Sequence, residues 1–329
     1  MSTADVGREG LGGVRPGREA RSWAEGGAAP LRLPADHPGA SYYEKSVINP
    51  PVWEELDIAG YLFAGGLAGA SSLLAAGAQF TERPKLARRA KLCATGAISA
   101  SLVALIHDLG RPTRFINMLR VFKPSSPMSV GTWILGAYSP LNFATTASDV
   151  LAVAPRGGRA AGAGAGMLGA AVATYTAALI ANTAVPAWHG GYREMPFLFA
   201  GSAGAAAAGF GLLAAPLAEN APACRMGAAG AGTELVAEQL MERRLGMVAQ
   251  TLRDGTAGKR LKAAKALSVA GALGAATLAR RSRLVAGLSG AALLAGSALT
   301  RFGLFAAGMA SARDPKYTVQ PQRERLGGT

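Results

Sequence analysis

A histidine and an aspartate stand side by side at the end of an apolar stretch of the chain. His107 and Asp108 follow the apolar residues 97–106 and precede Arg111 and Arg114. Imidazole titrates near neutral pH, so the two side chains could form a proton relay whose protonation is tuned by burial and by the arginines. Arg111 could instead pair with Asp108 only to hold the loop, because ion pairs at membranes serve both purposes.

Two further candidates lie near the start of an earlier apolar stretch. Asp57 and Tyr61 are four residues apart, so a helix would place them on the same side. Acidic residues are also favoured at helix N-termini by the helix dipole, and this explanation suffices for Glu54 and Glu55. Asp57 lies deeper and near Tyr61, so it is the better functional candidate.

Ionisable residues also occur within or beside the apolar stretches, where charges are costly and normally face the protein interior. The residues that could extend a proton path inward are Asp149, Glu234, Glu238 and Arg301. Glu234 and Glu238 are one helical turn apart, although a solvated helix end would explain the same spacing. An arginine such as Arg301 normally pairs with another group of the bundle.

The composition indicates the environment of these residues. Half of the 329 residues are hydrophobic and only 16% are charged, against about a quarter in an average soluble domain. The cations behind the net charge of +14 form short clusters between apolar stretches, such as 83–91 and 280–283. This distribution favours a lipid bilayer as the partner over nucleic acid.

Cysteine and histidine usage limits the redox groups that this chain could hold. Cys93 and Cys224 are isolated, so the chain has neither a CxxC motif nor a four-cysteine ferredoxin set. The three histidines are too few and too peripheral for a bis-histidine haem. We therefore expect no haem and no iron–sulfur cluster in this chain.

The apolar stretches predict an all-α integral membrane protein. Some spans are shorter than the roughly 20 residues that a perpendicular helix needs, so their bounds are approximate. About eight transmembrane helices, arranged as two four-helix bundles, are expected at 57–80, 92–106, 129–153, 160–185, 196–217, 221–245, 266–278 and 284–307.

The connector between the second and third spans has an amphipathic pattern. Phe115, Met118, Leu119 and Phe122 recur at three- and four-residue spacing. This pattern predicts a short helix lying in the membrane interface. An ordinary basic loop that anchors two spans is the alternative.

The two ends of the chain differ from the apolar domain at 42–312. Residues 1–41 lack periodicity and predict a disordered N-terminal tail, and the polar C-terminal tail, 313–329, is expected to extend over a partner. An even number of spans places both termini on one side of the membrane. The balance of Lys and Arg favours that side as cytoplasmic, although the cluster at 83–91 argues against it.

Several motifs together resemble one family of membrane proteins. The most specific is Asp-Leu-Gly-Arg-Pro-x-Arg-Phe at 108–115, followed by Ser-Pro-Met-Ser-x-Gly-Thr-Trp at 126–133. Further matches lie at 42–53, 61–69, 184–188, 198–202 and 301–315. With these residues, 41–325 resembles the NrfD/PsrC family, the membrane anchor subunits of polysulfide-reductase-type molybdoenzyme complexes.

The resemblance implies a subunit of an oxidoreductase complex in the cell inner or plasma membrane. It would pass electrons between menaquinone and a four-cluster ferredoxin-like iron–sulfur subunit, which in turn serves a molybdopterin catalytic subunit in anaerobic respiration. The implied quinone-binding residues are Trp53, Asp57, Tyr61, His107, Asp108 and Tyr138. Loop contacts, ion pairs and partner contacts are expected from Arg111, Arg114, Trp188, His189 and Arg193.

Two other functions remain open at this point. A membrane ion or proton translocator would explain the ionisable groups within the spans, and it predicts internal repeats related by inversion. A purely structural anchor would keep an enzyme at the membrane without quinone chemistry. If the chain does serve quinone, electrons could flow to a terminal reductase or from a dehydrogenase such as formate dehydrogenase.

Overall fold

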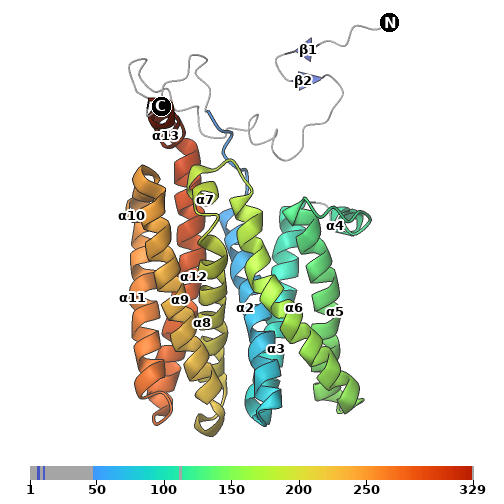
Figure 1. The fold of residues 1–329 in the computed structure, drawn as a ribbon. Coiled ribbons are helices and arrows are strands. Elements are labelled where there is room, and N and C mark those ends of the chain that lie inside the picture. Colours follow the sequence, from blue (N-terminus) through green and yellow to red (C-terminus); the bar gives the residue numbers. More distant parts are fainter. Residues whose placement is uncertain (1–5, 8–9, 12–46, 111–112, 328–329) are drawn as a thin grey trace, which may run out of the picture.

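The computed structural model describes residues 6–7, 10–11, 47–110 and 113–327, and nearly all of them are helical (Figure 1). Two-residue strands β1 (Val6–Gly7) and β2 (Gly10–Leu11) pair antiparallel near the N-terminus. The rest of the predicted tail, Tyr42, Tyr43 and the candidate Arg111 lie outside the described residues. The domain bounds at 41 and 313 therefore stay predictions.

The described residues form the long helices that the apolar stretches predicted. They are α2 (Glu55–Phe80), α3 (Pro84–Asp108), α5 (Pro127–Leu151), α6 (Pro155–Ala181), α8 (Met195–Ala214), α9 (Ala221–Leu245), α11 (Gly255–Thr277) and α12 (Arg283–Arg313). Five of them, α2, α3, α6, α8 and α12, are long and apolar enough to cross a membrane. The prediction of an all-α membrane protein is confirmed.

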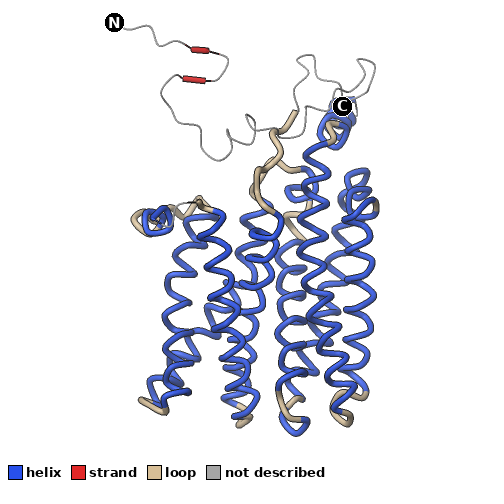
Figure 2. Tube along the Cα trace, turned by 180° about the vertical axis from the view of Figure 1, so that it is seen from behind, coloured by secondary structure: helices blue, strands red, loops and turns tan. Residues whose placement is uncertain are grey.

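Short elements join or follow the long helices. They are α4 (Thr113–Met118), α7 (Pro186–Gly190), η1 (Leu217–Glu219), η2 (Gly246–Ala249), α10 (Gln250–Arg253) and α13 (Lys316–Gly327). Seen from either side, α13, α7, α10 and α4 lie at one end of the molecule (Figures 1 and 2). We call this the terminal end, and the opposite end, with the α2–α3 and α8–α9 connections, the far end.

The long helices divide into two four-helix bundles. In bundle 1, α2 packs on α3 and α6, and α5 packs on α3 and α6. In bundle 2, α8 packs on α9 and α12, and α11 packs on the same two helices. Contacts of α8 with α2 and α6, and of α12 with α2, join the bundles, and the chain enters both bundles at the terminal end (Figure 1).

Glycine pairs allow the helices to approach closely. A Cβ added to Gly69 of α2 or to Gly169 of α6 would collide with the backbone of the other helix, and the same holds for Gly201 of α8 and Gly230 of α9. Apolar side chains alone give helices little reason to associate in lipid, so close backbone contact supplies much of the attraction. The small residues thus determine which helix faces are buried.

The structure corrects several predicted bounds. Helix α3 begins at Pro84 instead of residue 92, and α11 begins at Gly255 instead of residue 266. The basic segments that we assigned to loops are helical, because proline suits a first helical position and Lys and Arg favour helix. The expectation of an extended C-terminal tail is wrong: α13 is a helix, and its Tyr317 is buried against the main core.

The amphipathic connector contains the helix expected there. Helix α4 is six residues long and lies across the terminal end, at an angle to the long helices (Figure 1). Ile116, Val121 and Phe122 in and after it are exposed, and Phe122 packs edge-on against Trp133 of α5. Exposed apolar side chains at this level suit a membrane interface.

Candidate functional site

The helix termini of α2 and α3 bring His107 and Asp57 together. Nδ1 of His107 and Oδ2 of Asp57 are 2.7 Å apart. The His107 side chain is 67% exposed, whereas the Asp57 side chain is 13% exposed behind it. The pair therefore couples a partly buried carboxylate to the surface of the terminal end through one imidazole ring.

Tyr61 continues this arrangement one helical turn deeper in α2. Its hydroxyl is hydrogen-bonded to that of Tyr175 on α6, and the side chain is buried. Ser101 of α3 donates to the carbonyl oxygen of Tyr61 at 3.2 Å. Asp57 and Tyr61 lie on the same side of the helix, as their spacing predicts. The sequence did not single out Tyr175 as a partner.

The predicted relay between His107 and Asp108 differs from the observed pairing. Consecutive residues in a helix point in different directions, so the histidine meets Asp57 of the neighbouring helix. Asp108 is half-buried at the end of α3. Arg114 donates to the carbonyl oxygen of Leu109 at 3.1 Å and so holds the turn between α3 and α4.

Trp53 and Trp188 form an aromatic stack beside the start of α2. Their ring centroids are 5.8 Å apart, and Trp188 also contacts Phe305. Trp188 is fully buried, and its indole N–H donates to the carbonyl oxygen of Leu304 at 2.9 Å. Burial makes Trp188 a packing residue at the terminal end.

The loop after α7 presents cationic and aromatic groups at the terminal end. Arg193 donates to the hydroxyl of Tyr192 at 2.9 Å, and the Tyr192 ring stacks on His189. Arg244 at the end of α9 lies over the same Tyr192 ring and pairs with Glu194 at 3.2 Å. Arg193 and His189 thus belong to one exposed cluster at the terminal end.

Bundle 1 contains a chain of buried, neutral polar groups. Tyr138 donates to the carbonyl oxygen of Ala68 at 2.9 Å and is hydrogen-bonded to Ser72 at 2.7 Å. Ser72 donates to Asn142, and Asn142 donates to Thr95 at 3.1 Å. Since its hydroxyl has two partners in the core, Tyr138 lies in this chain and has no direct bond to the His107–Asp57 pair.

The chain continues toward the far end. Thr95 and Thr146 are 2.7 Å apart, and Thr146 donates to the carbonyl oxygen of Lys91 at 3.4 Å. The buried Lys91 ammonium pairs with Asp149 at 3.3 Å. We name this series, from Tyr138 to Asp149, the bundle 1 chain.

A small cavity borders the bundle 1 chain. It measures about 10 Å³ and is lined by Ser72, Asn142, Lys91 and Thr145 among others. The buried Thr145 hydroxyl has no hydrogen-bond partner among the described residues. The cavity is close to the size that one buried water needs, and such a water would satisfy this hydroxyl.

Bundle 2 buries charged groups instead. Glu234 of α9 accepts hydrogen bonds from Thr300 at 2.6 Å and from Ser268 at 3.4 Å. Arg301 lies over the Phe199 ring at 3.7 Å, donates to the Phe199 carbonyl oxygen at 2.9 Å and interacts electrostatically with Glu234. Its Nε and one Nη have no hydrogen-bond partner among the described residues.

A ladder of ion pairs leads from these groups to the terminal end. Glu238, one turn beyond Glu234, is 3.5 Å from Lys265 of α11, and Lys265 is 3.6 Å from Glu242. Glu242 also pairs with Arg253 of α10 at 3.1 Å. We name the series from Arg301 to Arg253 the bundle 2 ladder.

The four residues predicted to extend one proton path therefore lie in two networks. Asp149 ends the bundle 1 chain, whereas Glu234, Glu238 and Arg301 belong to the bundle 2 ladder. Sequence reasoning missed the threonine and serine members of the chain, because single hydroxyl residues in apolar helices carry no distinctive signal. It also missed the ion pair between Glu55 and Arg260, which links α2 to α11.

The described residues contain no group of three His, Cys, Asp or Glu side chains that could hold a metal ion. Both cysteines are buried and unpaired.

Comparison with known proteins gives one family. The model of the family described as polysulphide reductase, NrfD, matches residues 45–223, which include all of bundle 1, α8 and the His107–Asp57 pair. No curated protein matches the chain. The C-terminal motifs at 301–315 lie outside the matched segment. Because the match covers more than half of the 329 residues, the chain belongs to the NrfD family, whose members are membrane subunits of polysulfide-reductase-like complexes.

Proposed function

We propose that this chain is the quinone-interacting membrane subunit of a respiratory oxidoreductase. The observation that carries the proposal is the 2.7 Å pair of His107 and Asp57 at the terminal end. Members of the NrfD family generally assemble with iron–sulfur and molybdenum oxidoreductase subunits. In this proposal electrons pass between menaquinone and an iron–sulfur partner docked on the terminal end.

The residues at the terminal end have the chemistry that a quinone headgroup needs. A bound quinone takes up or releases two electrons and two protons at its carbonyl oxygens. A ligand of this kind requires hydrogen bonds and a proton donor that water can reach. His107 is largely exposed and is backed by a carboxylate, and the Trp53 ring next to α2 offers a flat apolar surface.

The His107–Asp57 pair can hold and move a proton. Asp57 binds Nδ1 of the ring and so orients it, which leaves Nε2 for a ligand carbonyl or for water. When the ring gives its Nε2 proton to the ligand, water at the terminal end can replace it. Tyr61, hydrogen-bonded to Tyr175, lies one helical turn deeper and is buried.

The experiment is quinol turnover by the purified complex. The full chain is produced with its partner subunits in the native host, and oxidation of a menaquinol analogue is followed with an electron acceptor. We expect His107→Ala and Asp57→Asn each to lower turnover about 100-fold, since positioned acid–base groups contribute about 10²–10⁴-fold. Arg120→Ala, an exposed change after α4, is the matched control.

Co-purification of the partners with each variant shows whether the complex still assembles. Unchanged turnover in both His107→Ala and Asp57→Asn, with assembly intact, would refute the site. Asp108→Asn tests the relay expected from the sequence. We expect it to have a smaller effect than Asp57→Asn, because the observed bond joins His107 to Asp57.

A second candidate function is proton transfer through the membrane, and the two polar networks favour it. The bundle 1 chain leads inward from the far end, and the bundle 2 ladder leads inward from the terminal end. Gly66 of α2 lies next to Arg301, since a Cβ at Gly66 would be 3.4 Å from its guanidinium, and Ala68 at the inner end of the chain follows on the same helix. The two networks thus approach each other at α2.

This candidate is tested in liposomes that contain the complex and a pH-sensitive dye. Quinol-driven proton movement is expected to fall severalfold in Asn142→Leu, which interrupts the bundle 1 chain, with quinol turnover measured in parallel. Proton movement unchanged relative to turnover would exclude this route. Proton movement without any redox partner would favour the translocator alternative. The fold argues against that alternative, because both bundles begin at the terminal end and so are not related by inversion (Figure 1).

We further propose that the chain resides in the plasma membrane with its terminal end in the cytoplasm. The cationic residues of the terminal end, such as Lys259, Arg260 and Lys262, support this orientation. A reporter fused after the last residue would show fluorescence or enzyme activity on the cytoplasmic side. Activity only on the outer side would reverse the orientation.

A further inference from the structure

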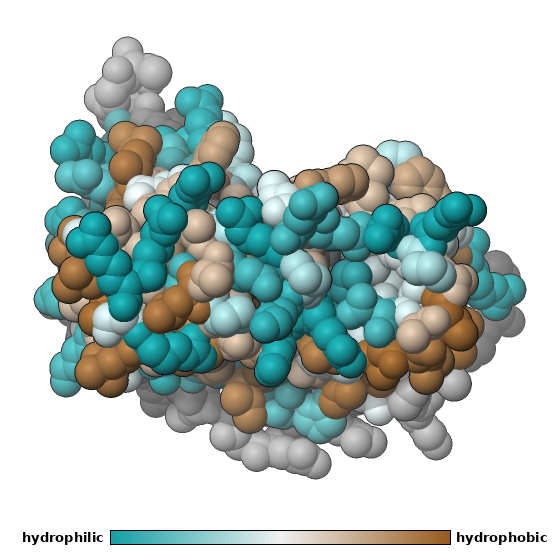
Figure 3. Space-filling model, turned by 90° about the horizontal axis from the view of Figure 1, so that it is seen from below, coloured by the Kyte–Doolittle hydropathy of each residue, from teal (hydrophilic) through white to brown (hydrophobic). Residues whose placement is uncertain are grey.

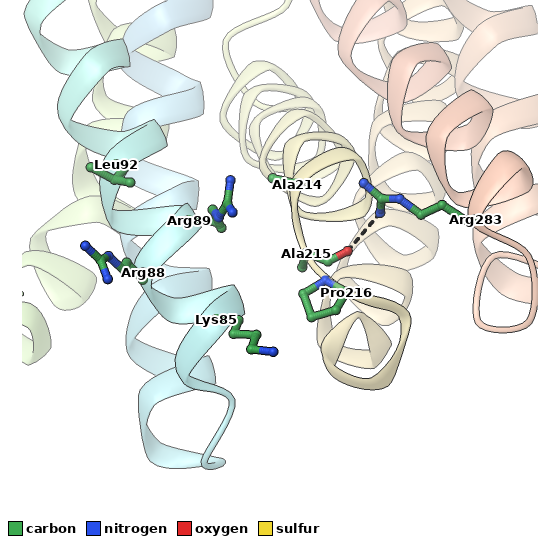
Figure 4. A pocket seen from close by; sticks show the side chains of 8 residues that line it. All are labelled: Lys85, Arg88, Arg89, Leu92, Ala214, Ala215, Pro216 and Arg283. Carbon is green, nitrogen blue, oxygen red and sulfur yellow. Dashed lines mark hydrogen bonds between the residues drawn. The ribbon is translucent and has the colours of Figure 1, made fainter.

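A cleft of about 690 Å³ opens at the far end between the two bundles. Its walls come from the first turns of α3, the last residues of α8 with Pro216, and Arg283 at the start of α12 (Figure 4). These three helices are long and apolar enough to cross a membrane, and all of them start or stop at the cleft. The cleft therefore lies at the level where lipid headgroups begin.

Cationic side chains face each other across this cleft. Lys85 and Arg89 are four residues apart on α3 and both line the cleft, and the Lys85 side chain extends toward Pro216 (Figure 4). Arg283 donates to the carbonyl oxygens of Leu212 and Ala215 at 2.9 and 2.8 Å, which fixes its guanidinium at the end of α8. One cation is thus held by bundle 2, while two extend from bundle 1.

Among the described residues, no acidic side chain lines the cleft to offset this positive charge. Arg88 also lines the cleft (Figure 4), but its guanidinium lies 3.9 Å from Asp149. The nearby Glu219 carboxylate accepts a hydrogen bond from the backbone N–H of Leu86 at 2.9 Å. Lys85 and Arg89 have no hydrogen bond or ion pair within the described part of the chain, so their charges are available to an anion.

The surroundings of the cleft favour a lipid over a free anion. Leu92 lines the cleft one turn further along α3 and is 44% exposed, so an apolar surface continues from the cations toward the membrane interior. Figure 3 views the far end from below and shows hydrophilic side chains spread over its centre. Basic pockets between transmembrane helices are suited to phosphate headgroups.

We propose that this cleft binds an anionic glycerophospholipid. Its phosphate lies among Lys85, Arg89 and Arg283, and one acyl chain follows α3 along Leu92. Because these cations come from both bundles, the bound lipid bridges bundle 1 and bundle 2 at the far end. The site is distant from the His107–Asp57 pair and does not depend on the proposed quinone chemistry.

The test measures lipid binding to the full chain purified in a neutral detergent. Native mass spectrometry and thermal unfolding are recorded with phosphatidylglycerol, with phosphatidylcholine and with inorganic phosphate. We expect phosphatidylglycerol to be retained and to raise the unfolding temperature, with a weaker effect of the other two. The double variant Lys85→Gln/Arg89→Gln should weaken retention about 30-fold, since each basic group near an anionic lipid contributes about a factor of five.

The matched control is Arg156→Gln/Arg159→Gln. These two exposed arginines lie in the first turns of α6, outside the cleft, so the control removes the same charge from another helix start. Arg89→Lys, which keeps the charge, should retain the lipid if the double variant fails to fold. Equal loss of lipid in the cleft variant and the control, or equal stabilisation by inorganic phosphate and phosphatidylglycerol, would overturn the proposal.

Discussion

Bundle 1 and bundle 2 each bury a polar network, but the networks differ in charge and in the end from which they start. The bundle 1 chain consists mainly of hydroxyls and one amide, and its ion pair of Lys91 with Asp149 lies toward the far end. The bundle 2 ladder places Glu234 and Arg301 in the core and continues through ion pairs to the terminal end. Both bundles use the same close helix packing.

The difference shows two ways to keep polar groups inside a membrane protein. Neutral groups need only mutual hydrogen bonds, and each bond contributes modestly to stability. Buried charged groups cost much more free energy to desolvate. A buried charge is therefore stable only when a group of opposite charge nearby compensates it. We therefore expect bundle 2 to be more sensitive than bundle 1 to the loss of a single polar residue.

The largest effect is expected for Arg301→Met. Arg301 and Glu234 are buried in the same core without a direct ion-pair contact. Removing one of the two charges should approach the loss of about 3–5 kcal/mol seen when a buried ion pair is broken, because the other charge is left uncompensated. The free energy of unfolding in detergent micelles measures the loss. Arg225→Met, on the exposed side of α9, should change it by less than about 0.5 kcal/mol.

A double variant separates the charge pair from simple packing. Glu234→Gln/Arg301→Met removes both charges and should recover much of the lost stability, because no charge stays buried alone. Equal losses in the single and double variants would mean that Arg301 acts through its stacking on Phe199 alone. The proposed contrast between the bundles would then fail.

A smaller loss is expected for Asn142→Leu in bundle 1. This side chain bridges Ser72 and Thr95, and leaving them without a partner should cost about 1–3 kcal/mol. Phe143→Leu at the adjacent, exposed position is the control for the same unfolding measurement. A loss as large as that of Arg301→Met would show that neutral and charged networks are equally critical.

His107→Ala should change stability still less. The ring is largely exposed, and exposed ion pairs contribute about 0–1 kcal/mol. The free energy of unfolding in detergent should therefore stay close to that of the unmodified protein, although quinol turnover falls. A stability loss above that of Asn142→Leu would indicate that the pair is chiefly structural.

The smallest effect is expected outside both bundles, at Lys316, the first residue of α13. A hydrogen bond from its ammonium to Asp314 raises the pKa of Lys316 above its ordinary value of 10.5. The contact thus stabilises the folded state below this pH, and its contribution is lost as the pH rises through the folded-state pKa. A spin label at the exposed Gln322 should gain mobility in that range.

Asp314→Asn provides the comparison for this pH effect. It removes the charged acceptor, so the label should show a smaller change over the same pH range, with the bundles unaffected. An identical pH response in the variant would assign the mobility change to another group.

The sequence alone determined the class of fold and the order of its helices. Apolar stretches of sufficient length predicted the long helices, because backbone polar groups in lipid must be paired within each span. The Asp-Leu-Gly-Arg-Pro block at 108–112 indicated the family, and His107 directly precedes this block. The position of the amphipathic helix also followed from residue spacing alone.

Only the tertiary structure decided which side chains meet. His107 pairs with Asp57, 50 residues away, because the start of α2 lies beside the end of α3. Asp149 and Glu234 are both acidic residues within or beside apolar stretches, so the sequence does not distinguish them. Helix packing places them in different bundles with different partners. Partner choice depends on contacts between helices, and local residue patterns do not encode these contacts.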